Sequence, residues 1–358
     1  DRIVDLSARL DKDGRVTWDV PAGRWTLMRF GYTPTGKDNH PAPLEGRGLE
    51  CDKLSREAVG KHFAGLMGKL IEDVGPAAGR TLTSTHIDSW EVHSQNWTPL
   101  FREEFRRRRG YDLLTMLPAM TGRIIDNLEV SERFLWDVRK TIGEMVLDNY
   151  ADHIRELAAR HGMKLSIEAY DDGPFDDLSY AGRADVPMGE FWMKSDYYFN
   201  TRMQTCRAMA SAAHTYGKPI CGAEAFTAFT EQARWINHPF SLKALGDEAF
   251  CEGINRFVFH RYAHQPWLDR KPGMTMGKWG IHYERTQTWW ELSRPWHEYL
   301  ARCNFMLRQG LYAADICYLQ TEGVPNGATH VARTAYEFDA CSPEVVLTRM
   351  SVRDGRLV

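Results

Sequence analysis

Four glutamates each close a short apolar run and stand beside an aromatic residue. They are Glu91 in SWEV, Glu168 in SIEAY, Glu190 in MGEFW and Glu224 in GAEAF. Burying an ionised carboxylate without a partner carries a large free-energy cost, so four such positions need a common explanation. Hydrolysis of a glycosidic bond supplies one, because one carboxylic acid protonates the leaving oxygen while a second carboxylate activates water or attacks the sugar.

The four carboxylates exceed the pair that this hydrolysis requires. Surplus carboxylate oxygens indicate a hard cation such as Ca²⁺, which prefers oxygen ligands. Each glutamate taken alone could instead be a structural ion-pair partner, and His86, His260 and His264 could be supporting groups or direct participants. Flat rings offer apolar surface to the CH faces of a sugar. The rings near the glutamates are Trp90, Trp97, Tyr170, Phe191, Trp192, Phe226 and Trp267.

A repeated pattern places these residues on a parallel sheet. RHGMKLSIEAY (160–170) and TYGKPICGAEAF (215–226) both run from a helix end through a glycine and a lysine into an apolar strand that ends in glutamate. Strands that alternate with helices imply a parallel sheet, and polar residues at strand carboxyl ends build the active site of a (β/α)8 TIM barrel. The strands expected from the pattern are residues 81–87, 164–168, 186–190, 219–224 and 255–261. Five strands predict an α/β fold that is an incomplete barrel, with the three earliest strands upstream of Asp1.

The predicted organisation has three parts. Residues 1–53 form the tail of a β-rich, sandwich-like domain, with strands over 15–20 and 24–33. Residues 54–312 form the partial catalytic barrel, and residues 313–358 start a further α/β or β segment. The chain begins without methionine and stops in mid-strand, which indicates a piece of a longer protein. Helices are expected from Ser55 through Ile71 and over 131–161, 198–216 and 282–309, where apolar residues recur at helical spacing.

Composition argues against several classes of function. The formal net charge is −3 and the pI is near 6.5, which argues against a nucleic-acid partner or an anionic membrane surface. No apolar stretch approaches the length of about 20 residues that spans a bilayer. The basic run Arg106 to Arg109 fits a solvated helix face. GRGLE (46–50) lacks the context of a nucleotide-binding loop, and HSQNW (93–97) lacks that of a serine-hydrolase nucleophile.

Several of these segments resemble glycoside hydrolase family 106, the α-L-rhamnosidases. The resemblance runs from about residue 20 to the C-terminus. Its motifs are EGRGLECDKLS (45–55), LTSTHIDSWEVHSQNW (82–97), FREEFRRRRGYD (101–112), LSIEAYDDGPFDD (165–177), ADVPMGEFW (184–192) and ICGAEAFT (220–227). It implies a bacterial enzyme, periplasmic or secreted, that removes terminal α-L-rhamnose from plant or pectic glycans.

The mechanism implied by the resemblance is inverting and assisted by calcium. Carried over by motif, Glu91 is the general acid, Glu224 is the base that activates water, and Glu190 is a calcium ligand. The division of the acid and metal roles among Glu91, Glu168 and Glu190 stays open. We assign contacts with a rhamnose-containing oligo- or polysaccharide to Asp88, Trp90, Glu168, Tyr170, Trp192, His260 and Tyr262.

Other interpretations of the same carboxylates stay open. A retaining barrel glycosidase of the β-galactosidase kind would use the same fourth- and seventh-strand glutamates, and the anomer of the product would distinguish it. A non-catalytic carbohydrate-binding domain would use the carboxylates only to hold a metal and a sugar. A fragment with no activity of its own is the third alternative.

Overall fold

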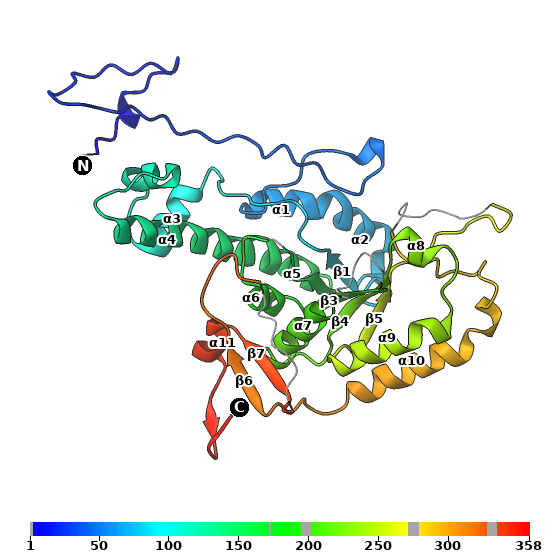
Figure 1. Ribbon diagram of the computed structural model, residues 1–358. Helices are drawn as coiled ribbons and strands as arrows, with labels where there is room; N and C mark the ends of the chain where they lie inside the picture. Colours follow the sequence, from blue (N-terminus) through cyan, green and yellow to red (C-terminus); the bar gives the residue numbers. More distant parts are fainter. Residues whose placement is uncertain (1–2, 172, 195–201, 271–278, 328–334) are drawn as a thin grey trace.

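Five parallel strands, hydrogen-bonded in the order of the chain, form the central sheet of this computed structural model (Figure 1). They are β1 (Ser84–Ile87), β2 (Lys164–Glu168), β3 (Val186–Trp192), β4 (Gly222–Thr227) and β5 (Arg256–Phe259). The structure describes residues 3–171, 173–194, 202–270, 279–327 and 335–358. Each of the five predicted barrel strands is confirmed, with differences of a few residues at the ends. Sequential parallel strands joined by helices make this sheet part of an α/β barrel.

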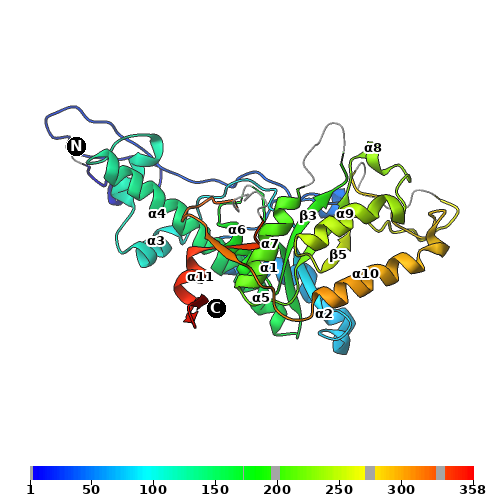
Figure 2. The ribbon, with the colours of Figure 1, turned by 60° about the horizontal axis from the view of Figure 1, so that its bottom comes forward.

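Helices connect the strands and cover one face of the sheet (Figure 2). The described helices are α1 (Arg56–Phe63), α2 (Lys69–Val74), α3 (Phe101–Arg109), α4 (Leu128–Val146), α5 (Asp152–Ala159), α6 (Asp177–Arg183), α7 (Met203–Thr215), α8 (Thr230–Ala233), α9 (Pro239–Cys251), α10 (Arg294–Leu307) and α11 (Pro343–Thr348). α5 packs on β2, α7 on β3 and α9 on β4, and α10 packs on α9. In the described chain, no helix has both the length and the apolar composition needed to cross a membrane.

The first predicted helix, from Ser55 through Ile71, is confirmed as α1, a π-helical turn and α2. Ser55 caps α1, because its Oγ accepts a hydrogen bond of 3.3 Å from the backbone N–H of Ala58. Val59 and Phe63 are buried, whereas Leu66 lies beyond the end of α1 and is exposed. A π-helical turn, Ala64–Gly68, joins α1 to α2, so the helical path continues past Ile71 to Val74. The apolar spacing therefore located the helix, although Leu66 and Leu70 are exposed.

The predicted helix over 131–161 begins three residues earlier. Asn127 is the cap, since its Oδ1 accepts from the backbone N–H of Val130 at 2.9 Å. Ser131 lies inside α4, and its hydroxyl bonds the backbone of Ile125. A π-helical turn, Leu147–Ala151, joins α4 to α5, so the helical path continues to Ala159.

The other two predicted helices are shorter than expected. α7 corresponds to the prediction over 198–216, of which residues 198–201 lie outside the described residues. α10 starts only at Arg294, with Pro295 in its first turn, where the fixed φ of proline suits a helix start. Trp289 therefore precedes α10 instead of lying on it.

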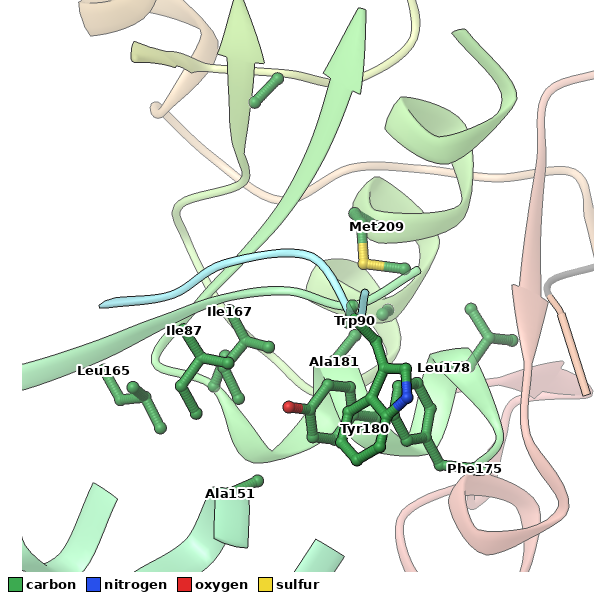
Figure 3. Packing of buried hydrophobic residues seen from close by; sticks show 14 of the residues in the cluster. Ile87, Trp90, Ala151, Leu165, Ile167, Phe175, Leu178, Tyr180, Ala181 and Met209 are labelled. Carbon is green, nitrogen blue, oxygen red and sulfur yellow. The ribbon is translucent and has the colours of Figure 1, made fainter. Parts of the chain in front are cut away.

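Side chains alternate across the sheet and give it one apolar face. The buried members of this face include Ile87, Leu165, Ile167, Phe191, Ala223 and Ala225. Figure 3 shows three of them, Ile87, Leu165 and Ile167, beside Ala151 of the covering helices. Burying each large aliphatic side chain stabilises the fold by about 1.5–3 kcal/mol. The opposite face of the sheet therefore remains for polar side chains.

The predicted strands over 15–20 and 24–33 are wrong for this structure. Within residues 3–53 the structure has no strand but two isolated bridges, Leu10 with Val16 and Asp38 with Leu49, and two short 3₁₀ helices, Ser7–Arg9 and Leu44–Gly46. The N-terminal part of this segment extends away from the sheet in Figure 1. An alternating pattern becomes a strand only when another strand accepts its backbone hydrogen bonds, and no described segment does so here. The boundary at residue 53 stays a prediction.

The segment after the partial barrel contains strand β6 (Ile316–Leu319). It pairs in parallel with β7 (Phe338–Cys341), and β8 (Val352–Arg353) pairs with β9 (Arg356–Leu357). β7 packs against α7. The carboxylate Oδ1 of Asp339 on β7 lies 2.9 Å from Nδ1 of His214 on α7. The sheet of β6 and β7 therefore lies against α7, as Figure 2 shows. Whether they start a separate domain at residue 313 stays a prediction.

The basic run of α3 is not a uniformly solvated face. The side chain of Arg108 is only 10% exposed, and its guanidinium group pairs with three carboxylates. The nitrogen–oxygen distances are 3.1 Å to Glu104, 3.2 Å to Glu144 and 2.6 Å to Asp148. Arg108 therefore ties α3 to α4 and to the π-helical turn that follows it.

Replacing this arginine is expected to destabilise the fold. Arg108→Met removes the arginine from Asp148 and one of two arginine partners from Glu104 and Glu144. The free energy of unfolding should therefore fall by about 1–3 kcal/mol in a urea titration. Arg133→Met is the matched control, because Arg133 is 77% exposed and pairs with the exposed Glu129, and it should change stability by less than about 0.5 kcal/mol. Equal effects of the two substitutions would contradict the structural role of Arg108.

Candidate active site

The polar face of the sheet carries three of the four predicted glutamates. Glu190 of β3 and Glu224 of β4 are direct partners in the parallel register, and Glu168 of β2 is the partner of Met188, two residues before Glu190. Because side chains alternate with a period of two, Glu168, Glu190 and Glu224 point to the same side of the sheet. His86 on β1 points to this side too, because it pairs with Ser166 of β2, two residues before Glu168.

Glu168 is the most deeply buried of these carboxylates, at 2% exposed. Burial raises the pKa of Glu168 well above its usual value, and the charges of Asp88, Glu224 and Glu190 raise it further. The hydroxyl of Tyr170 donates to Glu168 Oε2, and His86 Nε2 lies 3.4 Å from Oε1. Little of Glu168 is therefore accessible to a sugar, although it was predicted to contact one.

Glu190 is held between a cation and an indole. Its Oε1 pairs with the guanidinium of Arg202, and its Oε2 accepts from Trp192 Nε1 at 2.8 Å. Arg202 also bonds Asp171 and lies over the ring of Tyr170, 5.2 Å from the centroid. Burial raises the pKa of Glu190 to about 7, and Arg202 opposes this rise. Arg202 thus fixes the orientation of a carboxylate in the centre of the row.

Glu224 lies beside a hydroxyl and an imidazole. The hydroxyl of Thr227 donates to Glu224 Oε1, and His260 Nδ1, just after β5, lies 3.6 Å from the same oxygen. Burial raises the pKa of Glu224 to about 8; Thr227 opposes this rise, while Glu190 adds to it. Burial lowers the pKa of His260 to about 4, with a further contribution from Arg261, so His260 is neutral near pH 7.

Glu91 comes from a loop and not from a strand end. β1 ends at Ile87, and Glu91 follows four residues later, where it is exposed. The hydroxyl of Ser89 donates to Glu91 Oε1 at 3.1 Å. Glu91 lies near enough to Glu224 for its charge to raise the pKa of Glu224. The site therefore combines the exposed carboxylates of Asp88 and Glu91 with a row of buried and half-buried ones.

These pKa shifts predict how stability depends on pH. Folded Glu190 and Glu224 hold their protons up to about pH 7 and 8, against a usual value of 4.5, so the folded state binds more protons and the free energy of unfolding falls as pH rises toward 8. His260 acts in the opposite direction, but only below its usual value of 6.5. Urea titrations in EDTA should therefore show stability falling between pH 6.5 and 8.

A substitution tests the source of that slope. Glu224→Gln removes the larger of these two pKa shifts, so it should flatten the decline in stability between pH 6.5 and 8. Glu248→Gln, on the exposed side of α9, is the control and should leave the slope unchanged. A slope that survives unaltered in Glu224→Gln would show that Glu224 is not protonated in the folded state.

Two aromatic residues predicted to contact sugar lie in the interior instead. Trp90 is 5% exposed, packs edge-on against Tyr150 and Phe175 with centroid distances of 6.4 and 5.3 Å, and donates through Nε1 to the carbonyl of His93 at 2.8 Å. Figure 3 shows Trp90 and Phe175 within one cluster. Tyr170, at 3% exposed, is covered by Arg202 and donates to Glu168. Both assignments are therefore corrected to packing and support.

The other predicted sugar contacts lie on accessible or half-buried surface. Trp192 is half-buried, with ring centroids 4.9 Å from Phe229 and 5.7 Å from Trp279. Tyr262 is 56% exposed and meets Trp290 edge-on at 5.9 Å. Asp88 is exposed immediately after β1. These three positions, with His260, remain available to a ligand.

Comparison with known proteins decides the family. A family model described as alpha-L-rhamnosidase matches residues 1–358, the whole chain. This chain belongs to the alpha-L-rhamnosidase family. The resemblance inferred from the sequence motifs is thereby confirmed.

The relatives of this rhamnosidase-family chain are much longer than the chain itself. The structure of a rhamnosidase from Novosphingobium sp. PP1Y superposes with a TM-score of 0.86 at 30% identity, covering 99% of this chain and 35% of that one. A protein of Formosa agariphila named "Putative beta-glucuronidase" is 39% identical over 358 residues, which are 99% of this chain and 30% of that protein. The chain therefore spans about a third of the length of these relatives.

The calcium ion implied by the rhamnosidase family can be tested against the donor atoms present. Among the described residues, His86, Asp88 and Glu168 bring one ligand atom each within 4.8 Å of one another. Asp88 and Glu168 offer the oxygen ligands that Ca²⁺ prefers, whereas the imidazole of His86 suits transition metals better. The carboxylates thus fit a hard cation. Glu190, the predicted ligand, instead binds Arg202 and Trp192, so its role as a calcium ligand stays a prediction.

Sequence reasoning missed the groups that hold the rhamnosidase-family carboxylates in place. Arg202 contacts Glu190 from outside the strand-end motifs, and Thr227 contacts Glu224 from the end of its own motif, ICGAEAFT. Thr227 could have been found, because it follows Glu224 at a short spacing in GAEAFT. Arg202 gave no such signal, since only the tertiary fold brings the start of α7 to β3.

Proposed function

We propose that the protein releases terminal α-L-rhamnose from a rhamnose-containing oligo- or polysaccharide with inversion of configuration, using Glu91 as general acid and Glu224 as general base. The observation that supports this most is the row of carboxylates on one sheet face, with the exposed Glu91 within electrostatic range of the buried Glu224. Two carboxylates in different environments are what acid–base hydrolysis of a glycoside requires. Membership of the family supports rhamnose as the sugar. The substrate is of plant or pectic origin, and the enzyme is bacterial and acts in the periplasm or outside the cell.

Glu224 is placed to take a proton from water. Its Oε1 accepts from Thr227, an interaction that favours the ionised carboxylate. His260 is neutral, so it does not compete as a fixed cation for that oxygen. A Ca²⁺ ion held by Asp88 and Glu168 would supply positive charge, which favours ionised Glu224, and would bind sugar hydroxyls.

Glu91 is placed to protonate the leaving oxygen. It is exposed on its loop and therefore accessible to the bulky part of a substrate that leaves the site. Ser89 donates to one carboxylate oxygen, which leaves the other oxygen to carry the transferred proton. The carboxylate row thus provides the base, and the exposed loop provides the acid, for the glycosidic bond that is cleaved.

The relative named as a beta-glucuronidase supports a second candidate function. Its 39% identity over the chain is consistent with cleavage of a β-glucuronide by the same carboxylates. A uronic acid would then occupy the position that we assign to rhamnose.

The proposed function is tested by hydrolysis of two chromogenic substrates by the protein at its full natural length. We expect release of nitrophenol from 4-nitrophenyl α-L-rhamnoside and little from 4-nitrophenyl β-D-glucuronide. EDTA should abolish the rhamnosidase activity and added calcium should restore it. The reverse preference would favour the second candidate, and activity unaffected by chelation would exclude the metal.

A further inference from the structure

The loop that carries Glu91 has no regular structure of its own. It runs from the end of β1 at Ile87 to the start of α3 at Phe101, and residues 88–98 form no helix or strand. A general acid must lie within hydrogen-bonding reach of the oxygen that it protonates, and a misplacement of about 1 Å can cost a factor of about 10² in rate. Contacts from outside the loop must therefore fix the position of Glu91.

The far end of this loop is tied to the segment over residues 50–53. Asp52 accepts a hydrogen bond from the side chain of Gln95 through Oδ1, and one of 2.6 Å from the hydroxyl of Thr98 through Oδ2. In return, the backbone N–H of Lys53 donates to Gln95 Oε1 at 3.1 Å. Gln95 is therefore bound through both ends of its amide, so the loop cannot shift without breaking these bonds.

The near end of the loop is held through the residue that precedes Glu91. The ammonium group of Lys53 lies 5.5 Å from the ring centroid of Trp90 and 5.6 Å from that of Tyr150. Trp90 Nε1 also donates to the carbonyl of His93 at 2.8 Å. A desolvated cation is attracted to the face of an aromatic ring. Lys53 therefore helps to fix the indole from which the backbone continues to Glu91.

The ammonium group of Lys53 is itself held in place. The Lys53 side chain is 7% exposed, and its Nζ pairs with Glu50 Oε2 at 2.5 Å. The next residue is anchored too, because Asn149 Nδ2 donates to the carbonyl of Leu54 at 2.8 Å. A buried ion pair adds little net stability, since desolvation of the two charges offsets their attraction. An orienting role therefore explains the buried cation better than a stabilising one.

We propose that residues 50–53 form a brace that positions Glu91, with Asp52 and Lys53 as positioning residues. The brace belongs to the motif EGRGLECDKLS (45–55), to which neither the sheet nor the carboxylate row gives a role. It contacts the loop on both sides of the proposed acid, so it determines where the proton donor lies. The inference rests on the proposed function, because it requires Glu91 to be the general acid.

The test is Gln95→Leu in the protein at its natural length, which removes both reciprocal bonds and nearly keeps the volume of the side chain. We expect kcat/KM for methyl α-L-rhamnoside to fall by about 10- to 100-fold, because the acid is displaced. For 2,4-dinitrophenyl α-L-rhamnoside, whose leaving group needs no proton, the fall should be less than about threefold. Gln309→Leu, at an exposed glutamine just after α10, is the matched control and should change neither value.

Lys53 provides a second, independent variant, which also tests the brace if Gln95→Leu does not fold. Lys53→Met removes the cation from the ring of Trp90, so it should show the same dependence on the leaving group. Lys53→Arg keeps a cation that can stack on this ring and should recover most of the loss. A role in folding alone would instead lower kcat/KM equally for the two substrates.

Glu91→Gln, measured beside these variants, separates the inference from the proposed function. A loss that depends on the leaving group in Glu91→Gln, together with equal losses or no loss in Gln95→Leu and Lys53→Met, would overturn the brace and leave the proposed function standing. Equal losses for the two substrates in Glu91→Gln would overturn both.

Discussion

Glu224→Gln is expected to lower kcat for an aryl α-L-rhamnoside by a factor of about 10³, within the range that general acid–base groups contribute. The amide has the shape of the carboxylate but cannot accept a proton from water. It keeps an oxygen for the hydroxyl of Thr227 and for contact with His260, so KM should change little. The measurement is steady-state release of nitrophenol by the protein at its natural length.

Rescue by azide and a control substitution show whether the loss is specific to the base role of Glu224. Azide needs no base to act as a nucleophile, so it should restore part of the turnover in Glu224→Gln. Glu248→Gln on the exposed side of α9 should leave kcat unchanged. If Glu224→Gln kept most of the wild-type kcat, the base would be another member of the carboxylate row.

Glu91→Gln is expected to show a loss that depends on the leaving group. A sugar or methanol leaves only when its oxygen is protonated, so kcat/KM for such substrates should fall by about 10³. A dinitrophenolate leaves without a proton, so its kcat/KM should fall by less than about tenfold. The comparison of the two leaving groups in one variant measures proton donation directly.

The alternative roles of Glu91 predict another pattern. A carboxylate that only holds a metal or the sugar would affect both leaving groups equally. Ser89→Ala removes the hydroxyl that donates to Glu91 while the carboxyl group stays, so it should cause a much smaller loss. A uniform loss in Glu91→Gln would transfer the acid role to Glu168 or Glu190.

The barrel strands were predictable because their signals are local. Each expected strand is a short apolar run that follows a helix end, and chirality and alternation then determine which side chains share a face. The gathering of Glu168, Glu190 and Glu224 follows from the parallel register alone. Parallel strands bring their carboxyl ends to one rim whatever the connecting helices contain.

The features that were missed depend on partners distant in sequence. The alternating segments at 15–20 and 24–33 form no strand, because strand formation needs a hydrogen-bonding neighbour that local spacing does not reveal. Trp90 follows the same pattern beside a glutamate as Trp192, yet it is buried against Tyr150 and Phe175. Position beside an acidic residue does not distinguish a ring that faces a ligand from one that fills the core.

The central claim is that Glu91 and Glu224 act from opposite faces of one sugar ring, with a water molecule on the side of Glu224. The most direct measurement is proton NMR of the first product formed from an aryl α-L-rhamnoside, recorded before the sugar mutarotates. The account predicts that β-L-rhamnose appears first. Initial formation of α-L-rhamnose would contradict it, because retention requires a covalent intermediate on one of the carboxylates.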